Sequence, residues 1–392
     1  MISADFAPNE ELNDALISFV LLFQPWLWKS GKALKEVEEK IEARFPNHSV
    51  FFYLSARSGL FTILKALQLP KGSEVIVQAF TCEAVILPIM ANGLKPVYVD
   101  IESTTFSIDP IDLQKKITNK SKVLILQHSF SMTPAYREKV LSLVKEHNLL
   151  LIEDIAHGYS MKKAPNSTYL LSFGRSKALS SVFGGAVITN NKELKNTLGQ
   201  YGASLKMPSM IFILRLLLYK PLSVFIKSTY DLFIGKLVHK ITHLLRLIPL
   251  EITQKEKGGE YDPLLDKAYP NALAVLLSHQ LNKYEQILKH RALICDIYQK
   301  KLNTKYQILN TALLRFPILV DNPNLIRYKA AQRNIFLGSW YNQVVAPKSI
   351  DLTKMNYTKG SCPNAEEICK KMLNLPTNIS YREALKVISV IR

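Results

Sequence analysis

The residue types and spacing around Lys177 suit covalent chemistry on a carbonyl compound. Lys177 follows Ser172 in a Ser-x-x-x-x-Lys pattern, and Asp154 closes an apolar run upstream of both. A carboxylate at the end of a buried strand can hold the charge on a pyridine nitrogen, and a partly desolvated lysine amine can attack an aldehyde. This order is typical of a pyridoxal phosphate site. We expect Lys177 to form the Schiff base, Asp154 to pair with the ring nitrogen, and Ser172 to donate to the phosphate.

A second candidate segment is SARSG at 55–59, which follows a predicted strand at 50–54 and leads into a helical pattern. Free N–H groups at the start of a helix favour an anion, and an arginine adds forked donors. We therefore interpret Ala56, Arg57 and Ser58 as a cup for the phosphate. The glycines of a Walker or dinucleotide loop are missing from this segment. The alternative is an ordinary N-cap serine beside a solvated arginine.

Apolar runs alternate with amphipathic helical patterns along the first half of the chain. This rhythm predicts an α/β fold with a mostly parallel central sheet and helices on both faces. The predicted strands are 50–54, 74–77, 96–100, 122–127 and 149–153, and the predicted helices are 35–45, 60–69, 83–92 and 136–147. Because ligands bind at the carboxyl ends of the strands in such sheets, the residues just beyond the strands should converge on one crevice. These residues are Ser55, Phe80, His128 and Asp154.

The composition bounds the class of protein. The chain has 392 residues, of which 48% are hydrophobic and 21% charged, enough for two domains and a large core. The cysteines form no CxxC pair, so neither a metal site nor a disulfide framework is expected; they are Cys82, Cys295, Cys362 and Cys369. The residues near the N-terminus are acidic where a signal peptide would be basic, and the expected location is the cytoplasm.

The charge balance is strongly basic. Fifty lysines and arginines stand against 32 acidic residues, which gives a formal net charge of +18. Nucleic acid, a membrane surface or an anionic substrate would each account for this excess. Because no Cys/His finger, RNP motif or basic-aromatic platform is visible, we do not expect nucleic acid as a partner.

Several short motifs occur in an order known from one protein family. They are PKGSEVIV at 70–77, KPVYVD at 95–100, EDIAH at 153–157, SFGRSK at 172–177 and LNLP at 373–376. With these motifs in this order, the sequence resembles the DegT/DnrJ/EryC1/StrS aminotransferases, the sugar aminotransferase branch of fold-type I pyridoxal phosphate enzymes. The resemblance implies a fold-type I transferase with a smaller C-terminal α+β domain, whose active sites lie at a homodimer interface.

The resemblance also assigns roles to individual residues. Lys177, Asp154 and Ser172 match the family's cofactor-binding positions, and His157 stands where the family has Gln or His near the ring oxygen. The weaker expectation concerns residues that would face the substrate, which are Trp28, Ser30, His128 and Tyr341.

Three positions depart from the family pattern. Arg57 replaces the usual threonine of the phosphate loop, so the phosphate contact is expected to be made differently. Cys82 replaces the aromatic residue that stacks on the cofactor ring, and we expect Phe80 to compensate. The family's Asn-Tyr-Arg segment, which the partner subunit donates, is replaced by DKA at 266–268. This last change puts the usual cross-subunit phosphate contact and sugar recognition in doubt.

The sequence changes character between residues 204 and 250, where it is densely apolar and its charges are almost all basic. No apolar run there reaches the ~20 residues that would span a bilayer. The pattern favours helices that lie on an anionic membrane surface, at the inner membrane face; the alternative is a helical layer packed on the protein or its dimer partner. The expected division of the chain is an N-terminal arm at 1–34, a large cofactor-binding α/β domain at 35–203, an apolar basic helical insertion at 204–260 and a small C-terminal domain at 261–392.

The function predicted from these features is transfer of an amino group from an amino acid, expected to be glutamate, to a nucleotide-linked keto-sugar in polysaccharide or glycoconjugate biosynthesis. Two other hypotheses stay open. One is different pyridoxal phosphate chemistry at an amino-acid Cα. The other is a catalytically inactive, membrane-associated scaffold of the same fold, which Cys82 and the missing Asn-Tyr-Arg segment motivate.

Overall fold

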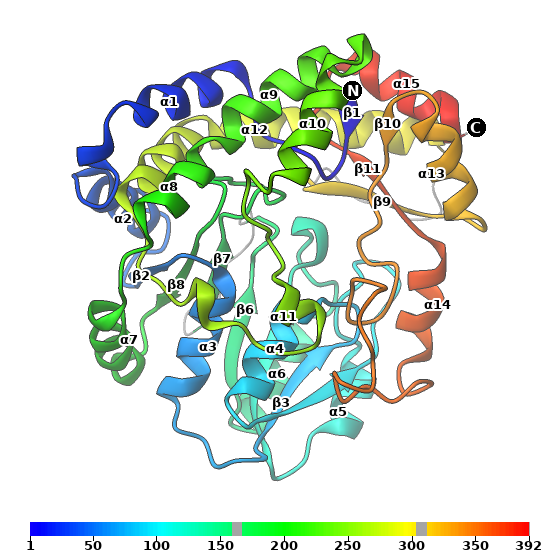
Figure 1. The fold of residues 1–392 in the computed structure, drawn as a ribbon. Helices are drawn as coiled ribbons and strands as arrows, with labels where there is room; N and C mark the ends of the chain where they lie inside the picture. Colours follow the sequence, from blue (N-terminus) through cyan, green and yellow to red (C-terminus); the bar gives the residue numbers. More distant parts are fainter. Residues whose placement is uncertain (159–166, 303–311, 392) are drawn as a thin grey trace.

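A seven-stranded sheet forms the centre of the computed structural model, which describes residues 1–158, 167–302 and 312–391 (Figure 1). The strand order is β2-β8-β7-β6-β5-β3-β4. The strands are β2 (Ser49–Tyr53), β3 (Glu74–Gln78), β4 (Lys95–Val99), β5 (Ser121–Gln127), β6 (Leu150–Asp154), β7 (Thr168–Ser172) and β8 (Gly185–Thr189). Only β8 runs against its neighbours, so the predicted α/β fold with a mostly parallel sheet is confirmed.

Alternating residues of the strands feed two separate cores. Val75 and Val77 of β3 pack on one face, which α3 (Ala56–Ala66) and α4 (Glu83–Ala91) cover. Ile76 points to the other face, where α5 (Pro110–Lys116) and α6 (Arg137–Glu146) lie. Since successive side chains of a strand point to opposite faces, a sheet buried on both sides needs the continuous apolar runs that the sequence contains.

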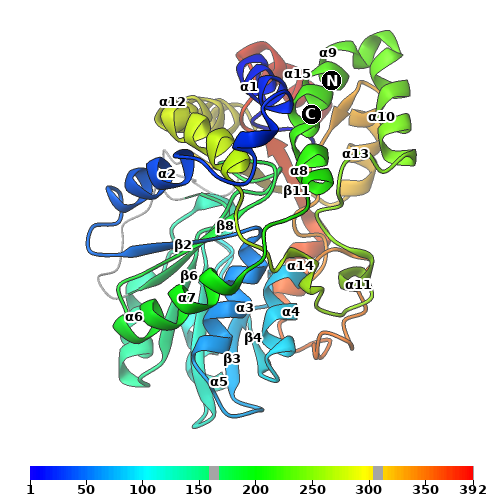
Figure 2. The same cartoon turned by 60° about the vertical axis from the view of Figure 1, so that its left-hand side comes forward.

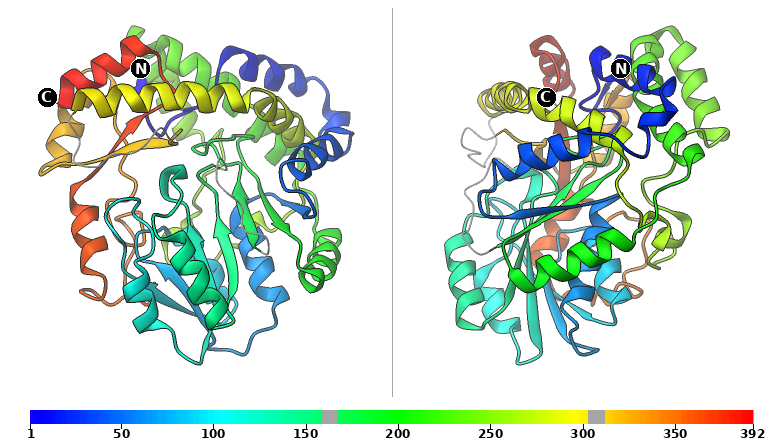
Figure 3. Two further views of the ribbon diagram at one scale, coloured as in Figure 1. Left: turned by 180° about the vertical axis from the view of Figure 1, so that it is seen from behind. Right: turned by 90° about the vertical axis from the view of Figure 1, so that its left-hand side faces the viewer.

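A second layer of helices lies beside the carboxyl ends of the strands. Its longest member is α12 (Asn271–Leu302), which runs across the top of the molecule in Figure 3 and packs on α2 (Ala33–Glu42) and α15 (Tyr381–Ile391). The C-terminal part adds a two-stranded antiparallel sheet of β9 (Arg315–Leu319) and β11 (Met372–Pro376). Three shorter helices are α7 (Lys192–Ser204), α13 (Pro323–Ala331) and α14 (Pro363–Lys371). Short 3₁₀ turns lie at Pro25–Leu27, Ser129–Ser131, Tyr230–Leu232 and Pro263–Leu265.

The first strand of the chain belongs to the C-terminal part of the molecule. β1 (Ile2–Ser3) pairs in parallel with β10 (Ile335–Phe336), and both ends of the chain lie in the upper part of Figure 1. Residues beyond β1 then approach the centre of the molecule, where the side-chain amide of Asn9 donates to the carbonyl of Lys177.

The apolar basic segment forms helices on the outside of this second layer (Figure 2). α8 (Met210–Leu217) and α9 (Tyr219–Thr229) pack on α1 (Leu12–Leu22), and α10 (Ile234–Leu244) packs on α9. The apolar residues on the inner faces of α8 and α9, among them Ile213, Leu216 and Ile226, are fully buried. α11 (Gln254–Lys257) ends the segment. No helix in the described parts of the chain is both long and apolar enough to cross a bilayer.

Candidate active site

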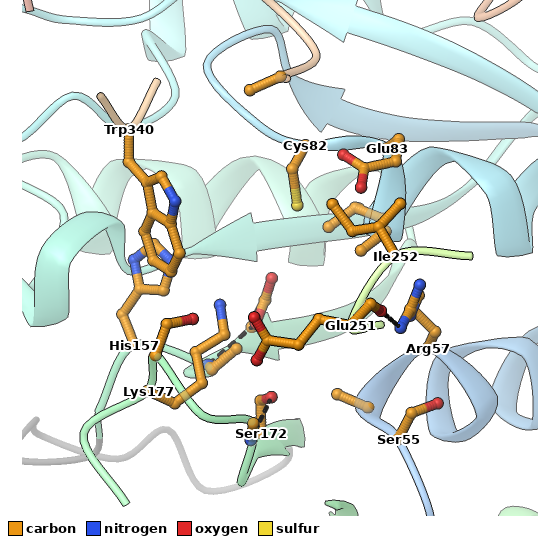
Figure 4. Close-up of a pocket in the computed structure, with 18 of the residues that line it drawn as sticks. Ser55, Arg57, Cys82, Glu83, His157, Ser172, Lys177, Glu251, Ile252 and Trp340 are labelled. Carbon is orange, nitrogen blue, oxygen red and sulfur yellow. Dashed lines mark hydrogen bonds between the residues drawn. The ribbon is translucent and has the colours of Figure 1, made fainter. Parts of the chain in front are cut away.

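A cavity of about 280 Å³ opens where the parallel strands of the sheet end. Gln127, Asp154 and Ser172 are the last residues of β5, β6 and β7, and all three line it. The first residues of α3 and α4 form the wall beside them. This placement is the one expected for an α/β sheet, in which the chain leaves each strand and exposes a side chain at the same edge. Figure 4 shows the cavity with Lys177 near its centre.

Lys177 lies in the loop that joins β7 to β8. The loop is held by its own backbone, because the N–H of Lys177 donates to Gly174 O at 3.1 Å and the N–H of Ser181 donates to Phe173 O at 3.1 Å. Burial lowers the pKa of Lys177, while Asp154 is among the groups that oppose this shift. A lysine with a lowered pKa keeps a larger neutral fraction, which is the form that attacks a carbonyl carbon.

The carboxyl group of Asp154 lies at the base of the cavity and is 5% exposed. It accepts hydrogen bonds from the side-chain amide of Gln127 at 3.1 Å and from the N–H of Ala156 at 3.0 Å. Burial raises the pKa of Asp154, whereas the Ala156 N–H and the charge of Lys177 act against this rise. A cationic ring nitrogen bound here would favour the ionised carboxylate further.

The predicted phosphate loop is in fact the first turn of α3. The side chain of Ser55 caps the helix by accepting the N–H of Ser58 at 3.1 Å, so helix formation begins at Ala56 rather than near residue 60. Ser55, Ala56 and Arg57 line the cavity, as expected. The side chain of Ser58 does not, because its hydroxyl is buried and donates to Leu265 O at 2.8 Å. The expectation that Ser58 faces a phosphate was wrong.

Arg57 is neither solvated nor unpaired. Its guanidinium forms an ion pair with the buried carboxylate of Glu256 and donates to the carbonyl of Glu251. Both partners come from the segment that follows the apolar helices. The positive charge expected at the cup is therefore present, but acidic and carbonyl oxygens of this chain already contact it.

His157 stands between two aromatic groups on the far wall. Its ring stacks on Trp340 with centroids 5.2 Å apart, and its Nδ1 accepts the N–H of Phe130 at 2.9 Å. Burial, followed by the charge of Lys177, lowers the pKa of His157 well below 6.5, so the ring is neutral at neutral pH. Its Nε2 lies 3.2 Å from the hydroxyl of Tyr341. His157 and Tyr341 both line the cavity, as the sequence predicted.

Two residues expected at the crevice lie outside it. Phe80 is fully buried and packs against Phe130 and Tyr341, so it offers no ring face to the cavity. His128 is also buried, and its Nε2 contacts Glu153 Oε2 at 2.9 Å. Because side chains alternate along a strand, Gln127 and Asp154 face the cavity while His128 and Glu153 face the opposite side of the sheet.

Trp28 and Ser30 do not reach the cavity of their own chain either. Trp28 is buried among the outer helices, where its indole N–H donates to Leu21 O at 2.7 Å, and Ser30 is exposed. Cys82 does line the cavity, and burial raises the pKa of its thiol to about 12. Trp340 also lines the cavity, with the amine of Lys177 4.5 Å from its ring centroid.

Sequence reasoning missed several residues of the cavity wall, among them Glu83, Glu251, Ile252 and Trp340. Glu83 immediately follows Cys82 at the start of α4, so it could have been predicted as a neighbour of the expected site residue Cys82. Trp340 adjoins the predicted Tyr341. Glu251 and Ile252 lie far from every motif in the sequence, and no local pattern marked them.

Glu83 is expected to make stability fall as the pH rises. Burial raises its pKa from 4.5 to about 7, and one carboxyl oxygen lacks a hydrogen-bond partner. The folded protein therefore binds a proton more tightly than the unfolded chain, so stability contributed by the protonated group is present below pH 4.5 and is lost as the pH rises to 7. The loss amounts to about 3 kcal/mol.

The measurement compares thermal unfolding of the wild type and Glu83→Gln at several pH values. The amide keeps the shape of the side chain without the titration. We expect similar midpoints near pH 5 and a more stable variant at pH 8. If the midpoints of the two proteins differ by the same amount at pH 5 and at pH 8, Glu83 does not titrate in this range.

The comparisons with known proteins agree with this geometry. The sequence profile of the DegT/DnrJ/EryC1/StrS aminotransferase family matches residues 15–204 and 269–392. GDP-perosamine synthase of Escherichia coli O157:H7 is 31% identical over 180 residues, which cover 43% of this chain and 48% of that protein. A dTDP-3-amino-3,6-dideoxy-alpha-D-galactopyranose transaminase of Aneurinibacillus thermoaerophilus is 35% identical over 163 residues, which cover 38% of this chain and 44% of the transaminase. Each of these alignments thus spans less than half of the relative's length.

Solved structures extend the likeness to the whole fold. NtdA from Bacillus subtilis, crystallised with bound cofactor PMP, superposes with a TM-score of 0.72 at 19% identity, over 98% of this chain and 81% of that chain. At this identity the likeness concerns the fold, and it confirms the fold-type I architecture expected from the sequence. With its profile match over most of its length, the chain belongs to the DegT/DnrJ/EryC1/StrS aminotransferase family.

Proposed function

We propose that this protein is a pyridoxal phosphate-dependent aminotransferase that moves an amino group from glutamate to a nucleotide-linked keto-sugar. The observation that carries the proposal is the joint presence of Lys177 and Asp154 in one cavity at the carboxyl edge of the sheet. Family membership adds the reaction class, and relatives named as nucleotide-sugar transaminases support the substrate class. The products would serve polysaccharide or glycoconjugate biosynthesis in the cytoplasm.

The residues of the cavity fit pyridoxal 5'-phosphate, the cofactor that the family implies. Asp154 is a buried carboxyl with room in front of it, as a ring nitrogen requires. Ser172 and the first N–H groups of α3, at Ala56 and Arg57, are the donors available for a phosphate. Trp340 and His157 line the space that the ring would occupy. When bound, the cofactor acts as an electron sink for the carbon that carries the amino group.

The protein's own groups then perform three tasks. The amine of Lys177, whose pKa burial lowers, takes a proton from the carbon that carries the amino group and returns it to the product. The carboxylate of Asp154 stabilises positive charge at the ring nitrogen. Burial keeps His157 neutral, and Phe130 N–H and Tyr341 orient its ring. Because Nδ1 accepts the Phe130 N–H, the proton of the neutral ring lies on Nε2, which can donate a hydrogen bond without adding charge.

The deciding experiment incubates the purified protein with glutamate and a panel of nucleotide keto-sugars, with products read by mass spectrometry. We expect a mass change that replaces the keto oxygen by an amino group, together with 2-oxoglutarate. A half-reaction with glutamate alone separates the alternatives by absorbance. Release of carbon dioxide or loss of a leaving group would favour other chemistry at Cα, and a protein that stays colourless with added cofactor would favour the inactive scaffold.

We further propose that the active protein is a homodimer that contacts an anionic membrane surface through α10. The apolar side chains at Ile234, Leu237, Ile241, Leu244 and Leu245 recur at helical spacing, and all are exposed. Lys236 and Lys240 flank this stripe. An exposed apolar stripe beside lysines is the pattern of a helix that lies on anionic head groups. α8 and α9 instead pack on the protein, as the alternative hypothesis expected.

A flotation assay with vesicles tests the membrane contact. Leu237→Gln combined with Leu244→Gln removes apolar area without changing charge, so binding to anionic vesicles should fall at least roughly tenfold. Deleting the whole segment is a poor test, because α8 and α9 contribute buried core residues. Ile111→Gln, an exposed apolar position on α5, is the matched control. Equal flotation of all three proteins would contradict the proposal, and sedimentation of the same samples reports the dimer.

A further inference from the structure

The segment at 249–258 lies over the cavity and separates it from the apolar helices. Two of its residues, Glu251 and Ile252, line the cavity wall. Residues 205–268, which include this part of the wall, lie outside the family match. Glu256 fixes the segment in place: its carboxylate accepts the N–H of Thr253 at 2.7 Å, pairs with Arg57, and is buried.

The carboxylate of Glu251 contacts hydrogen-bond donors of Arg175 at the cavity wall. Its Oε1 accepts the backbone N–H of Arg175 at 3.0 Å and lies 3.7 Å from the Nε of the same arginine. A Cβ built on Gly174 would meet this oxygen at 3.5 Å and the hydroxyl of Ser172 at 3.7 Å. In Figure 4 the carboxylate reaches between Lys177 and Arg57, on the side of Ser172.

The position of this carboxylate coincides with the place where a phosphate is expected. The Arg175 N–H that it accepts belongs to the turn directly after Ser172, and Ser172 and the first N–H groups of α3 are the phosphate donors proposed above. Glu251 already uses the Arg175 N–H, and Glu256 already neutralises Arg57. A phosphate bound to the same donors would lie beside the negative charge of Glu251, and like charges in close contact weaken binding.

We propose that Glu251 competes with the phosphate of the cofactor, so that segment 249–258 sets how tightly the phosphorylated cofactor is held. This inference rests on the proposed cofactor. The segment would then change the affinity for the phosphorylated cofactor and leave the affinity for unphosphorylated pyridoxal unchanged. The segment joins α10, which is proposed above to contact a membrane, to α12, so the same residues link the outer helices to the cavity.

Binding of pyridoxal phosphate and of pyridoxal, followed by absorbance on cofactor-free protein, tests the proposal. Glu251→Gln keeps the shape and the acceptor oxygen but removes the charge. We expect it to bind pyridoxal phosphate roughly tenfold more tightly than the wild type and to bind pyridoxal equally well. Glu251→Ala should show the same selectivity, and Glu260→Gln, at an exposed position just beyond the segment, should behave like the wild type.

Two outcomes would overturn the inference. An unchanged ratio of pyridoxal phosphate to pyridoxal affinity would show that Glu251 does not compete with phosphate. Selectively weaker binding of the phosphorylated form would show that Glu251 helps to hold it. Because no amino donor or sugar is present, these results are independent of aminotransfer. If Glu251→Gln binds pyridoxal phosphate selectively more tightly but the wild type aminates no keto-sugar, the inference stands and the proposed reaction is refuted.

Discussion

Replacing Lys177 by alanine is expected to lower the rate of aminotransfer by about 10³-fold or more. The side chain lines the cavity together with Asp154, and burial lowers its pKa, which enlarges the neutral fraction of the amine. Positioned general acid-base groups contribute ~10²–10⁴-fold to rate, and this residue is also the only group proposed to hold the cofactor covalently. Steady-state rates with glutamate and the accepted keto-sugar give the measurement.

Borohydride reduction gives an independent readout of the same residue. Wild-type protein reduced in the presence of pyridoxal phosphate should carry the label on the peptide that contains position 177, and the alanine variant should carry none there. Lys192→Ala, at an exposed position on α7, controls for the loss of a lysine and should keep both rate and label. A labelled peptide elsewhere in the wild type would remove Lys177 from the proposed chemistry.

Replacing Lys220 by methionine is expected to destabilise the protein by about 3–5 kcal/mol. Lys220 is fully buried on α9, where its amine donates to Glu10 Oε1 at 3.2 Å and to Ser180 O at 3.0 Å. Without the lysine, the carboxylate of Glu10 remains buried and loses its cation. At an unfolding entropy of about 2 cal/mol/K per residue, the thermal midpoint should fall by roughly 4–6 °C.

A second substitution separates the lost ion pair from the lost packing. Lys220→Met combined with Glu10→Gln removes the unpaired charge and should recover part of the midpoint. Lys240→Met, at an exposed position on α10, should change stability by less than about 0.5 kcal/mol. A midpoint unchanged by Lys220→Met would mean that water or another cation satisfies Glu10.

The sheet was predictable because its strands are covered on both faces. β3, β5 and β6 therefore read as unbroken apolar runs, and the predicted strands differ from the observed ones by one or two residues. The start of α3 was placed too late because Ser55 caps the helix within the polar sequence SARSG. A capping hydrogen bond is a local feature, but hydrophobic periodicity does not register it.

Within the site, prediction succeeded where chemistry and strand end coincide. Asp154, Ser172 and Lys177 belong to one stretch of chain around β6 and β7 and lie together in the cavity. The prediction for His128 was wrong because this residue lies one position beyond Gln127, so its side chain points to the opposite face of the sheet. The alternation of strand side chains held the information, since counting from Asp154 assigns Gln127 to the cavity.

The remaining residues of the wall depend on contacts between distant parts of the chain. Glu251 reaches the cavity only because Glu256 and Arg57 pair across almost two hundred residues of sequence. Trp340 is placed by Arg315, whose guanidinium lies 3.4 Å from the centre of the indole ring, and by the stacked ring of His157. Neither contact leaves a periodic signature, so only the folded structure reveals them.

The parallel pairing of β1 with β10 has a consequence for how the molecule is made. Ile2 and Ser3 are synthesised before their partners Ile335 and Phe336, which follow only after more than three hundred further residues. At roughly 5–20 residues per second, the nascent N-terminal arm waits many seconds before it can dock. Asn9, which contacts the carbonyl of Lys177, lies on that arm. The active-site loop is therefore expected to reach its final form only after β10 has been synthesised.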